Sequence, residues 1–217
     1  MMYSPAYNRI EDRAELLAFM RANNFALLVT GTGGALHASH LPVIVEERGA
    51  EAQKPRNGDG ERLVLVMHMA KANPQWRELF DDEVLVVFFG PHAYISPRWY
   101  EQKERVPTWN YAAVHVYGTA RIIEGRQAKH AAQAKLVAVH DPQWLPAFAS
   151  LRGQYVDDML DAIVNFEIAV TRIETRWKLS QNRGRREQEL IAAQLEKSVD
   201  GVERSLAALT RKHFVPE

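Results

Sequence analysis

Cysteine is absent from this sequence of 217 residues. The absence excludes a disulfide scaffold, thiolate metal ligands and cysteine nucleophiles, and it agrees with a reducing compartment. Long apolar runs are missing too: no stretch approaches the roughly 20 residues that span a bilayer, and no apolar run follows a basic start at the beginning of the chain. We therefore expect a cytoplasmic protein that is neither exported by a visible signal nor embedded in a membrane.

An excess of either charge is also missing, because Lys and Arg total 27 and Asp and Glu total 27. No global positive field can therefore gather nucleic acid. One local basic cluster, Arg183, Arg185 and Arg186, stands beside Glu187 and Glu189, as is usual at a solvated helix start. No segment reads as a helix-turn-helix with a basic recognition helix. We expect direct DNA binding to be weak or absent.

What the sequence does have is the composition of a folded protein, with 47% hydrophobic and 25% charged residues. Apolar alternation predicts strands, and apolar spacing of three and four residues predicts helices. The expected strands cover residues 25–30, 35–45, 63–69, 83–89 with a continuation over 94–97, 109–124, and 166–170. The expected helices cover residues 10–23, a segment beginning at Asn73-Pro74, 127–139, 157–164, and a pair within 185–213 that is interrupted near Asp200-Gly201.

This order is too rich in antiparallel pairing for a doubly wound sheet. We expect an α+β, mostly β fold: an antiparallel split barrel with peripheral helices over residues 1–182, followed by a C-terminal helical extension over 183–217. Gly118 lies inside an expected strand and predicts a bulge or close packing there. The polar stretch 46–62 reads as a long loop.

Two histidines, His40 and His68, lie at or near the ends of expected strands. Polar groups at strand ends line the mouth of a barrel, so a ligand pocket is at least as good an interpretation as a histidine bonded within the wall. For His115, inside a strand, we prefer the wall. No HxxxH or HExxH spacing links these residues, and we expect no metal site.

Lys71 and Asn73 fall between a strand and the start of a helix. The lysine and free backbone N–H groups at such a corner suit an anion such as a phosphate. For Asn73 a helix N-cap is the better interpretation on sequence alone, although both roles can coexist.

Aromatic and amide side chains are concentrated in two further segments. In Trp109-Asn110-Tyr111, neighbouring side chains point to opposite faces of a strand, so one face can be core and the other can contact a planar ligand. The segment with Lys178, Ser180, Gln181 and Asn182 supplies many hydrogen-bond donors after the last strand. A polar loop before a helix is the alternative for that segment.

Six segments, taken in order, carry a resemblance to a known family. They are Met2-Tyr3-Ser4-Pro5, Ser39-His40-Leu41-Pro42, Asn73-Pro74-Gln75-Trp76, Gly90-Pro91-His92-Ala93-Tyr94-Ile95-Ser96-Pro97, Val106-Pro107-Thr108-Trp109-Asn110-Tyr111 and Lys178-Leu179-Ser180-Gln181-Asn182. Together they resemble the PaiB family of FMN-binding negative transcriptional regulators. The resemblance implies a split β-barrel of the kind shared with pyridoxamine-phosphate oxidases and flavin reductases, with FMN at a homodimer interface.

The resemblance also implies which positions contact FMN. One subunit would supply Ser39, His40, His68, Met69, Lys71 and Asn73, and its partner would supply Lys178 with Ser180, Gln181 and Asn182. The oxidases' Arg-x-Val-Leu-Leu-Lys strand is replaced by 38–43, so a pyridoxine-phosphate substrate is not expected. Two other functions remain open: a flavin-dependent reductase or oxidase of a small substrate, and a haem-binding protein of the same fold.

Overall fold

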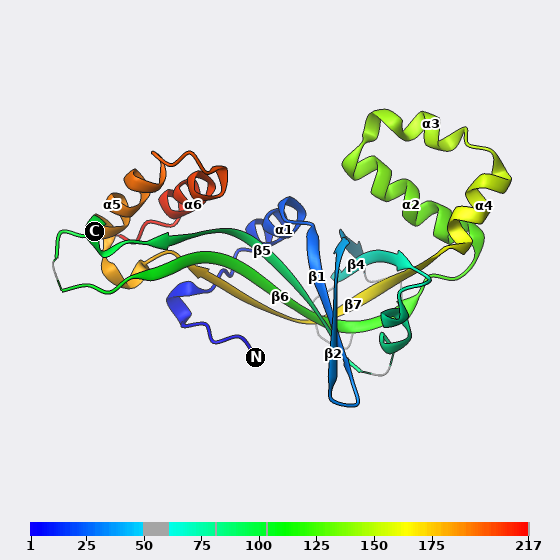
Figure 1. Cartoon of the computed structure of the whole chain (residues 1–217), viewed down its shortest axis with the longest axis horizontal. Coiled ribbons are helices and arrows are strands. Elements are labelled where there is room, and N and C mark those ends of the chain that lie inside the picture. Colours follow the sequence, from blue (N-terminus) through cyan, green and yellow to red (C-terminus); the bar gives the residue numbers. More distant parts are fainter. Residues whose placement is uncertain (50–60, 81, 103, 217) are drawn as a thin grey trace. The chain divides into compact units, whose positions relative to one another are not determined.

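Seven strands and six α-helices are present in the computed structural model, which describes residues 1–49, 61–80, 82–102 and 104–216 (Figure 1). The strands are β1 (Phe25–Thr32), β2 (Ala35–Pro42), β3 (Ile44–Gly49), β4 (Glu61–Ala70), β5 (Val84–Ile95), β6 (Thr108–Ile122) and β7 (Ile163–Lys178). The helices are α1 (Arg13–Ala22), α2 (Arg126–His140), α3 (Leu145–Ala149), α4 (Gly153–Asp161), α5 (Arg185–Leu195) and α6 (Gly201–Lys212). The predicted α+β, mostly β class is confirmed.

The strands form one sheet in the order β2-β1-β5-β6-β7-β4-β3. Pairing is antiparallel between β1 and β2, β1 and β5, β3 and β4, and β4 and β7. The outermost strands, β2 and β3, are separated in sequence by Val43 alone. A single residue spans only about 7 Å between its flanking Cα atoms. The hydrogen-bonded order is open, and this short link holds the end of one edge strand, β2, beside the start of the other, β3.

The chain divides into two compact units, which we describe separately. The terminal unit consists of Met1–Phe19, Phe89–His115 and Glu174–Glu217, and the barrel unit consists of Met20–Phe88 and Val116–Ile173. Strands β5, β6 and β7 contribute residues to both units. The division predicted from the sequence, between residues 182 and 183, stays a prediction.

The core of the barrel unit is built from fully buried strand residues, among them Leu28, Leu65, Val86, Phe166 and Ile168 at 0% exposure. Each such side chain stabilises the fold by about 1.5–3 kcal/mol. A Cβ on Gly118 would overlap the backbone oxygen of Ala169. The predicted close packing at Gly118 is therefore confirmed: β6 and β7 approach each other there because this position lacks a side chain.

Trp177, at 1% exposure, is central to the core of the terminal unit, and its ring centroid lies 4.5 Å from that of Phe19. Helices α5 and α6 bury Ile191, Leu195 and Leu206. The predicted helix pair is confirmed, with its break over residues 196–200. Among the described residues, no helix is long and apolar enough to cross a membrane.

Two expected strands differ in the structure. The segment 35–45 is not one strand but two, because the chain turns at Val43, whose side chain is 1% exposed. Conversely, β5 continues through Gly90 and Pro91, where an interruption was predicted. Proline tolerates this place because β1 pairs with β5 only up to Val87, so that the later part of β5 is an edge.

The alternation of buried and exposed side chains along β5 nevertheless shifts by one residue near Pro91. Buried positions run over Val84, Val86 and Phe88 before it and over Ala93 and Ile95 after it. The helix expected from Asn73 is only a short 3-10 helix, η2 (Pro74–Glu78). Of the expected loop 46–62, residues 46–49 belong to β3 and 61–62 to β4, and 50–60 lie outside the described residues.

Candidate functional site

A polar cluster in the barrel unit is organised by Gln75, which is 3% exposed. Its Nε2 donates to the backbone oxygens of Leu28 at 3.3 Å and His37 at 3.2 Å, and to Thr30 Oγ1 at 3.2 Å. Its Oε1 accepts from Ser39 Oγ at 2.6 Å. One amide thus fastens η2 to both strands of the β1–β2 hairpin.

Two predicted site residues belong to this cluster. Asn73 Oδ1 accepts from the Gln75 N–H at 3.0 Å, which confirms the predicted N-cap. Asn73 Nδ2 donates to Ser39 Oγ at 3.0 Å. Both side chains are half-buried and held in fixed orientations. Any ligand contact they make would therefore use preorganised groups.

Lys71 is exposed at the end of β4, and its backbone is anchored on both sides. Its N–H donates to the Ala162 oxygen at 2.8 Å, and its oxygen accepts from Trp76 Nε1 at 3.0 Å. The exposed amine of Lys71 therefore extends from an anchored backbone, which suits contact with an anion. His40 is also exposed, with its ring 5.9 Å from that of Phe25.

The two remaining predicted residues of the barrel unit, His68 and Met69, are less accessible. Met69 is 2% exposed and belongs to the core. His68 is half-buried opposite Asn165 on β7, and burial lowers its pKa. The imidazole is therefore mostly neutral near pH 7. Among the described residues, no group of three or more His, Asp or Glu side chains could hold a metal ion.

The terminal unit carries a chain of aromatic rings, here called the aromatic strip, on β5 and β6. It consists of Phe89, His92, Tyr94, Trp109 and Tyr111, with successive ring centroids 4.7–6.3 Å apart. Trp109 is 53% exposed and Phe89 is 52% exposed. Rings at these separations form an apolar surface against which another planar group can stack.

The face of β6 opposite the aromatic strip is internal. Asn110 is fully buried there, as strand alternation predicts for the residue between Trp109 and Tyr111. Asn110 Nδ2 donates to Ser180 Oγ at 2.9 Å, and the Ser180 hydroxyl is 3.1 Å from Asn110 Oδ1. Ser180 has a φ of 63°, a left-handed conformation that costs a non-glycine residue about 1–3 kcal/mol. The Asn110 side chain holds this turn in place.

Gln181 has a similar local role. Its Oε1 accepts from the Leu179 N–H at 2.8 Å and its Nε2 donates to the Trp177 oxygen at 2.6 Å. Asn182, the next residue, is exposed. Lys178 donates to Thr108 Oγ1. Lys178, Ser180 and Gln181 are therefore hydrogen-bonded within the terminal unit.

Cations gather around Lys178. Burial lowers the pKa of Lys178, and the charges of Arg176 and Arg183 lower it further. Arg176 Nε is buried and has no hydrogen-bond partner among the described residues, and the same is true of Nε of Arg105, which lies with Arg183 near Tyr100. Like charges held together with unused donors are stabilised by an anion, so this end of the terminal unit suits a phosphate or carboxylate.

The sequence reasoning missed several of these groups. Arg176 could have been found, because it lies two residues before Lys178 and so shares a face of the same strand. Gln75 lay within the Asn73–Trp76 motif, but nothing in the sequence signals that its amide joins three segments. Arg105 lies in a loop, where no periodicity indicates its neighbours.

Solved structures of low sequence identity share this fold. The FAD and heme binding protein from Mycobacterium smegmatis superposes with a TM-score of 0.56 at 18% identity, over 78% of this chain and 72% of that one. The flavocytochrome Anf3 from Azotobacter vinelandii gives a TM-score of 0.54 at 12% identity, over 77% and 68%. The antiparallel sheet with its helices therefore defines a protein of the split-barrel fold.

The family follows from sequence comparison. Residues 2–172 match the family described as "Putative FMN-binding domain". The protease synthase and sporulation protein PAI 2 of Bacillus subtilis is 33% identical over 210 residues, which are 96% of each chain. This chain belongs to that FMN-binding family, and the resemblance to PaiB is confirmed.

Proposed function

We propose that this protein is a cytoplasmic FMN-binding regulator that works as a homodimer, with flavin bound where two subunits meet. The observation that carries the proposal is the aromatic strip, which offers surface for a planar ring system. Positive charge for an anion is supplied by Lys71, whose backbone is anchored, and in addition by the cations around Lys178. FMN combines these two chemistries in one molecule.

In this proposal the predicted residues divide the work between two copies of the chain. Trp109 and Tyr111 pack against the ring system. Lys71 meets the phosphate, near Ser39, His40, His68, Met69 and Asn73, while the second copy supplies Lys178, Ser180, Gln181 and Asn182. Bound FMN would supply two-electron or one-electron redox chemistry, and the residues named here would bind and orient it.

The absorption spectrum of the purified protein tests the ligand directly. Flavin bands, with FMN rather than FAD in the extract released by heat, are the expected result. A Soret band would instead favour a haem protein. That alternative has a specific observation behind it, because His68 is half-buried and its lowered pKa keeps it neutral, as a metal-binding imidazole must be.

A turnover assay with the purified protein distinguishes a regulator from an enzyme. A flavin-dependent reductase or oxidase would consume NADH or NADPH in the presence of an electron acceptor, whereas a regulator would not. The regulatory role is supported by membership of the PaiB family, and by the name of its Bacillus subtilis relative, which refers to protease synthesis and sporulation. With zero net charge, we expect the protein to act on transcription through a partner.

A further inference from the structure

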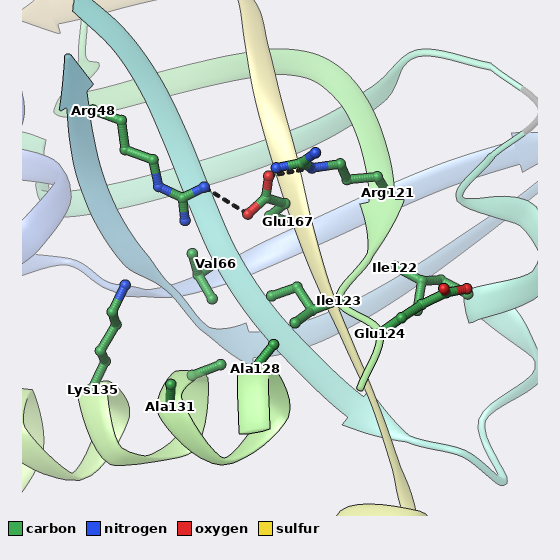
Figure 2. A pocket seen from close by; sticks show the side chains of 11 residues that line it. Arg48, Val66, Arg121, Ile122, Ile123, Glu124, Ala128, Ala131, Lys135 and Glu167 are labelled. Atoms are coloured by element: carbon green, nitrogen blue, oxygen red, sulfur yellow. Dashed lines mark hydrogen bonds and ion pairs between the residues drawn. The ribbon is translucent and has the colours of Figure 1, made fainter. Parts of the chain in front are cut away.

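A cavity of about 400 Å³ lies in the barrel unit between α2 and the sheet (Figure 2). Its apolar surface comes from Val66 and Ile123 on the sheet side and from three alanines of α2, Ala128, Ala131 and Ala132. These alanines have the spacing of one helix face, where a helix packed fully onto a sheet carries larger side chains. Ala132 is buried whereas Ala128 and Ala131 are exposed, so the cavity opens to solvent beside α2.

Charged side chains of alternating sign run along one wall of the cavity, and all of them except Glu46 belong to its lining. Lys135 Nζ donates to Glu46 Oε1 at 2.6 Å, and Arg48 Nη2 lies 2.7 Å from Glu46 Oε2. Arg48 Nη1 donates to Glu167 Oε2 at 2.8 Å, and Arg121 Nε donates to Glu167 Oε1. Figure 2 shows Arg48 and Arg121 approaching Glu167 from opposite sides. The five groups run from α2 across β3 and β7 to the end of β6.

The carboxylate oxygens of these charged groups are all used as acceptors, whereas some of the cationic donors are not used. Both carboxylate oxygens of Glu46 and both of Glu167 accept a hydrogen bond. Within the part of the chain that the structure describes, Arg121 is bonded only through Nε and Lys135 uses one of its three donors, so further donors of both side chains stay available. The remaining carboxylate of the lining, Glu124, points away from Glu167 in Figure 2. Cationic donors are therefore left over on this wall after both oxygens of Glu46 and of Glu167 have been used.

We propose that this cavity binds a small amphipathic carboxylate, with its apolar body on the alanine face of α2 and its carboxylate on Arg121 or Lys135. The volume of about 400 Å³ lies within the roughly 300–1,000 Å³ of small-molecule sites. Apolar surface next to unused cationic donors is the pattern that recognises such a ligand. None of the residues proposed for FMN lines the cavity, so this is a separate effector site.

Fluorine NMR of the FMN-loaded full-length protein tests the proposal with three probes of one shape. The anion is para-fluorophenylacetate, the neutral analogue is para-fluorophenylethanol and the cation is para-fluorophenethylamine. We expect the anion to bind about tenfold or more tightly than the neutral analogue, since a charge-assisted hydrogen bond has at least that value. The cation should bind most weakly. Equal binding of the three, or displacement of the anion by added FMN, would overturn the proposal.

Four variants locate the site. Arg121→Gln should weaken binding of the anion about tenfold and leave binding of the neutral probe unchanged. Arg126→Gln removes an exposed arginine of α2 that is paired with Asp157, and it should change neither. Ala131→Leu should abolish binding of both probes by filling the cavity, and the matched Ala138→Leu, on α2 but outside the cavity, should not. Melting temperatures and flavin spectra show that each variant is folded. Full binding by Ala131→Leu would refute the location.

Discussion

Lys71→Ala gives the sharpest test of where the phosphate of FMN binds. The lysine side chain is exposed, and the structure holds its position through backbone bonds to Ala162 and Trp76, which alanine retains. Stability should therefore be nearly unchanged. The loss of one charge-assisted hydrogen bond should weaken FMN by about 1.5–3 kcal/mol, or roughly 10–150-fold. Riboflavin lacks the phosphate, so its affinity should stay the same.

Quenching of flavin fluorescence, titrated with FMN and with riboflavin, measures both affinities in one assay. The matched control is Arg77→Ala, which removes a neighbouring exposed cation whose guanidinium lies 4.7 Å from the Trp76 ring. It should alter neither affinity. Equal weakening of both ligands by Lys71→Ala would refute the assignment. A selective loss of FMN in Lys178→Ala, with none in Lys71→Ala, would move the phosphate to the cations of the terminal unit.

Four further predictions concern assembly, DNA and stability. Sedimentation at low micromolar concentration should show a homodimer, and a clean monomer that still binds FMN would contradict the interface. Titration with promoter DNA and scrambled DNA at physiological salt should show weak binding without preference, and nanomolar selective binding would refute this and make Arg183 the first residue to mutate. Gln75→Ala should lower the free energy of unfolding by about 2–3 kcal/mol in urea, because it removes the buried hydrogen bonds that join η2 to Leu28, His37 and Ser39. An unchanged urea midpoint would show that these hydrogen bonds do not stabilise the fold. Burial raises the pKa of Glu167, but Arg48 and Arg121 lower it more, so the net pKa is lowered in the folded protein. The ion pairs of Glu167 should therefore stabilise the fold above the ordinary pKa of about 4.3, and this stabilisation should be lost as the pH falls below it. Glu167→Gln should flatten the acid part of the curve of unfolding free energy against pH, and an unchanged curve would exclude Glu167 as the source.

Much of the fold could be predicted because local patterns agree with it. The helix pair after residue 185 follows from apolar steps of three and four, and the N-cap at Asn73 follows from its place before a proline. Gly118 was informative because only glycine permits the approach to Ala169. These features are encoded within a few residues of where they act.

Features that depend on distant neighbours could not be predicted in the same way. Val43 is apolar and fits an uninterrupted strand, so nothing local signals that β2 ends there. Pro91 suggests a break, yet the absence of β1 beyond Val87 lets β5 continue. Arg183 reaches Lys178 from the turn after β7, and the ion pairs that join Glu167 to Arg48, Arg121, Glu46 and Lys135 bring together β7, β3, β6 and α2. Sequence spacing carries no information about such neighbours.

The one-residue link at Val43 also decides where the protein can be engineered. The β1–β2 turn has Gly33 and Gly34 at φ values of 59° and 86° with open space around both, so a peptide tag or fluorescent reporter inserted there only lengthens a hairpin. An insertion of the same length beside Val43 would remove the short link that holds the end of β2 beside the start of β3. The hairpin tip is therefore the place for a reporter. A protease site at the Val43 link would separate the two edge strands, β2 and β3.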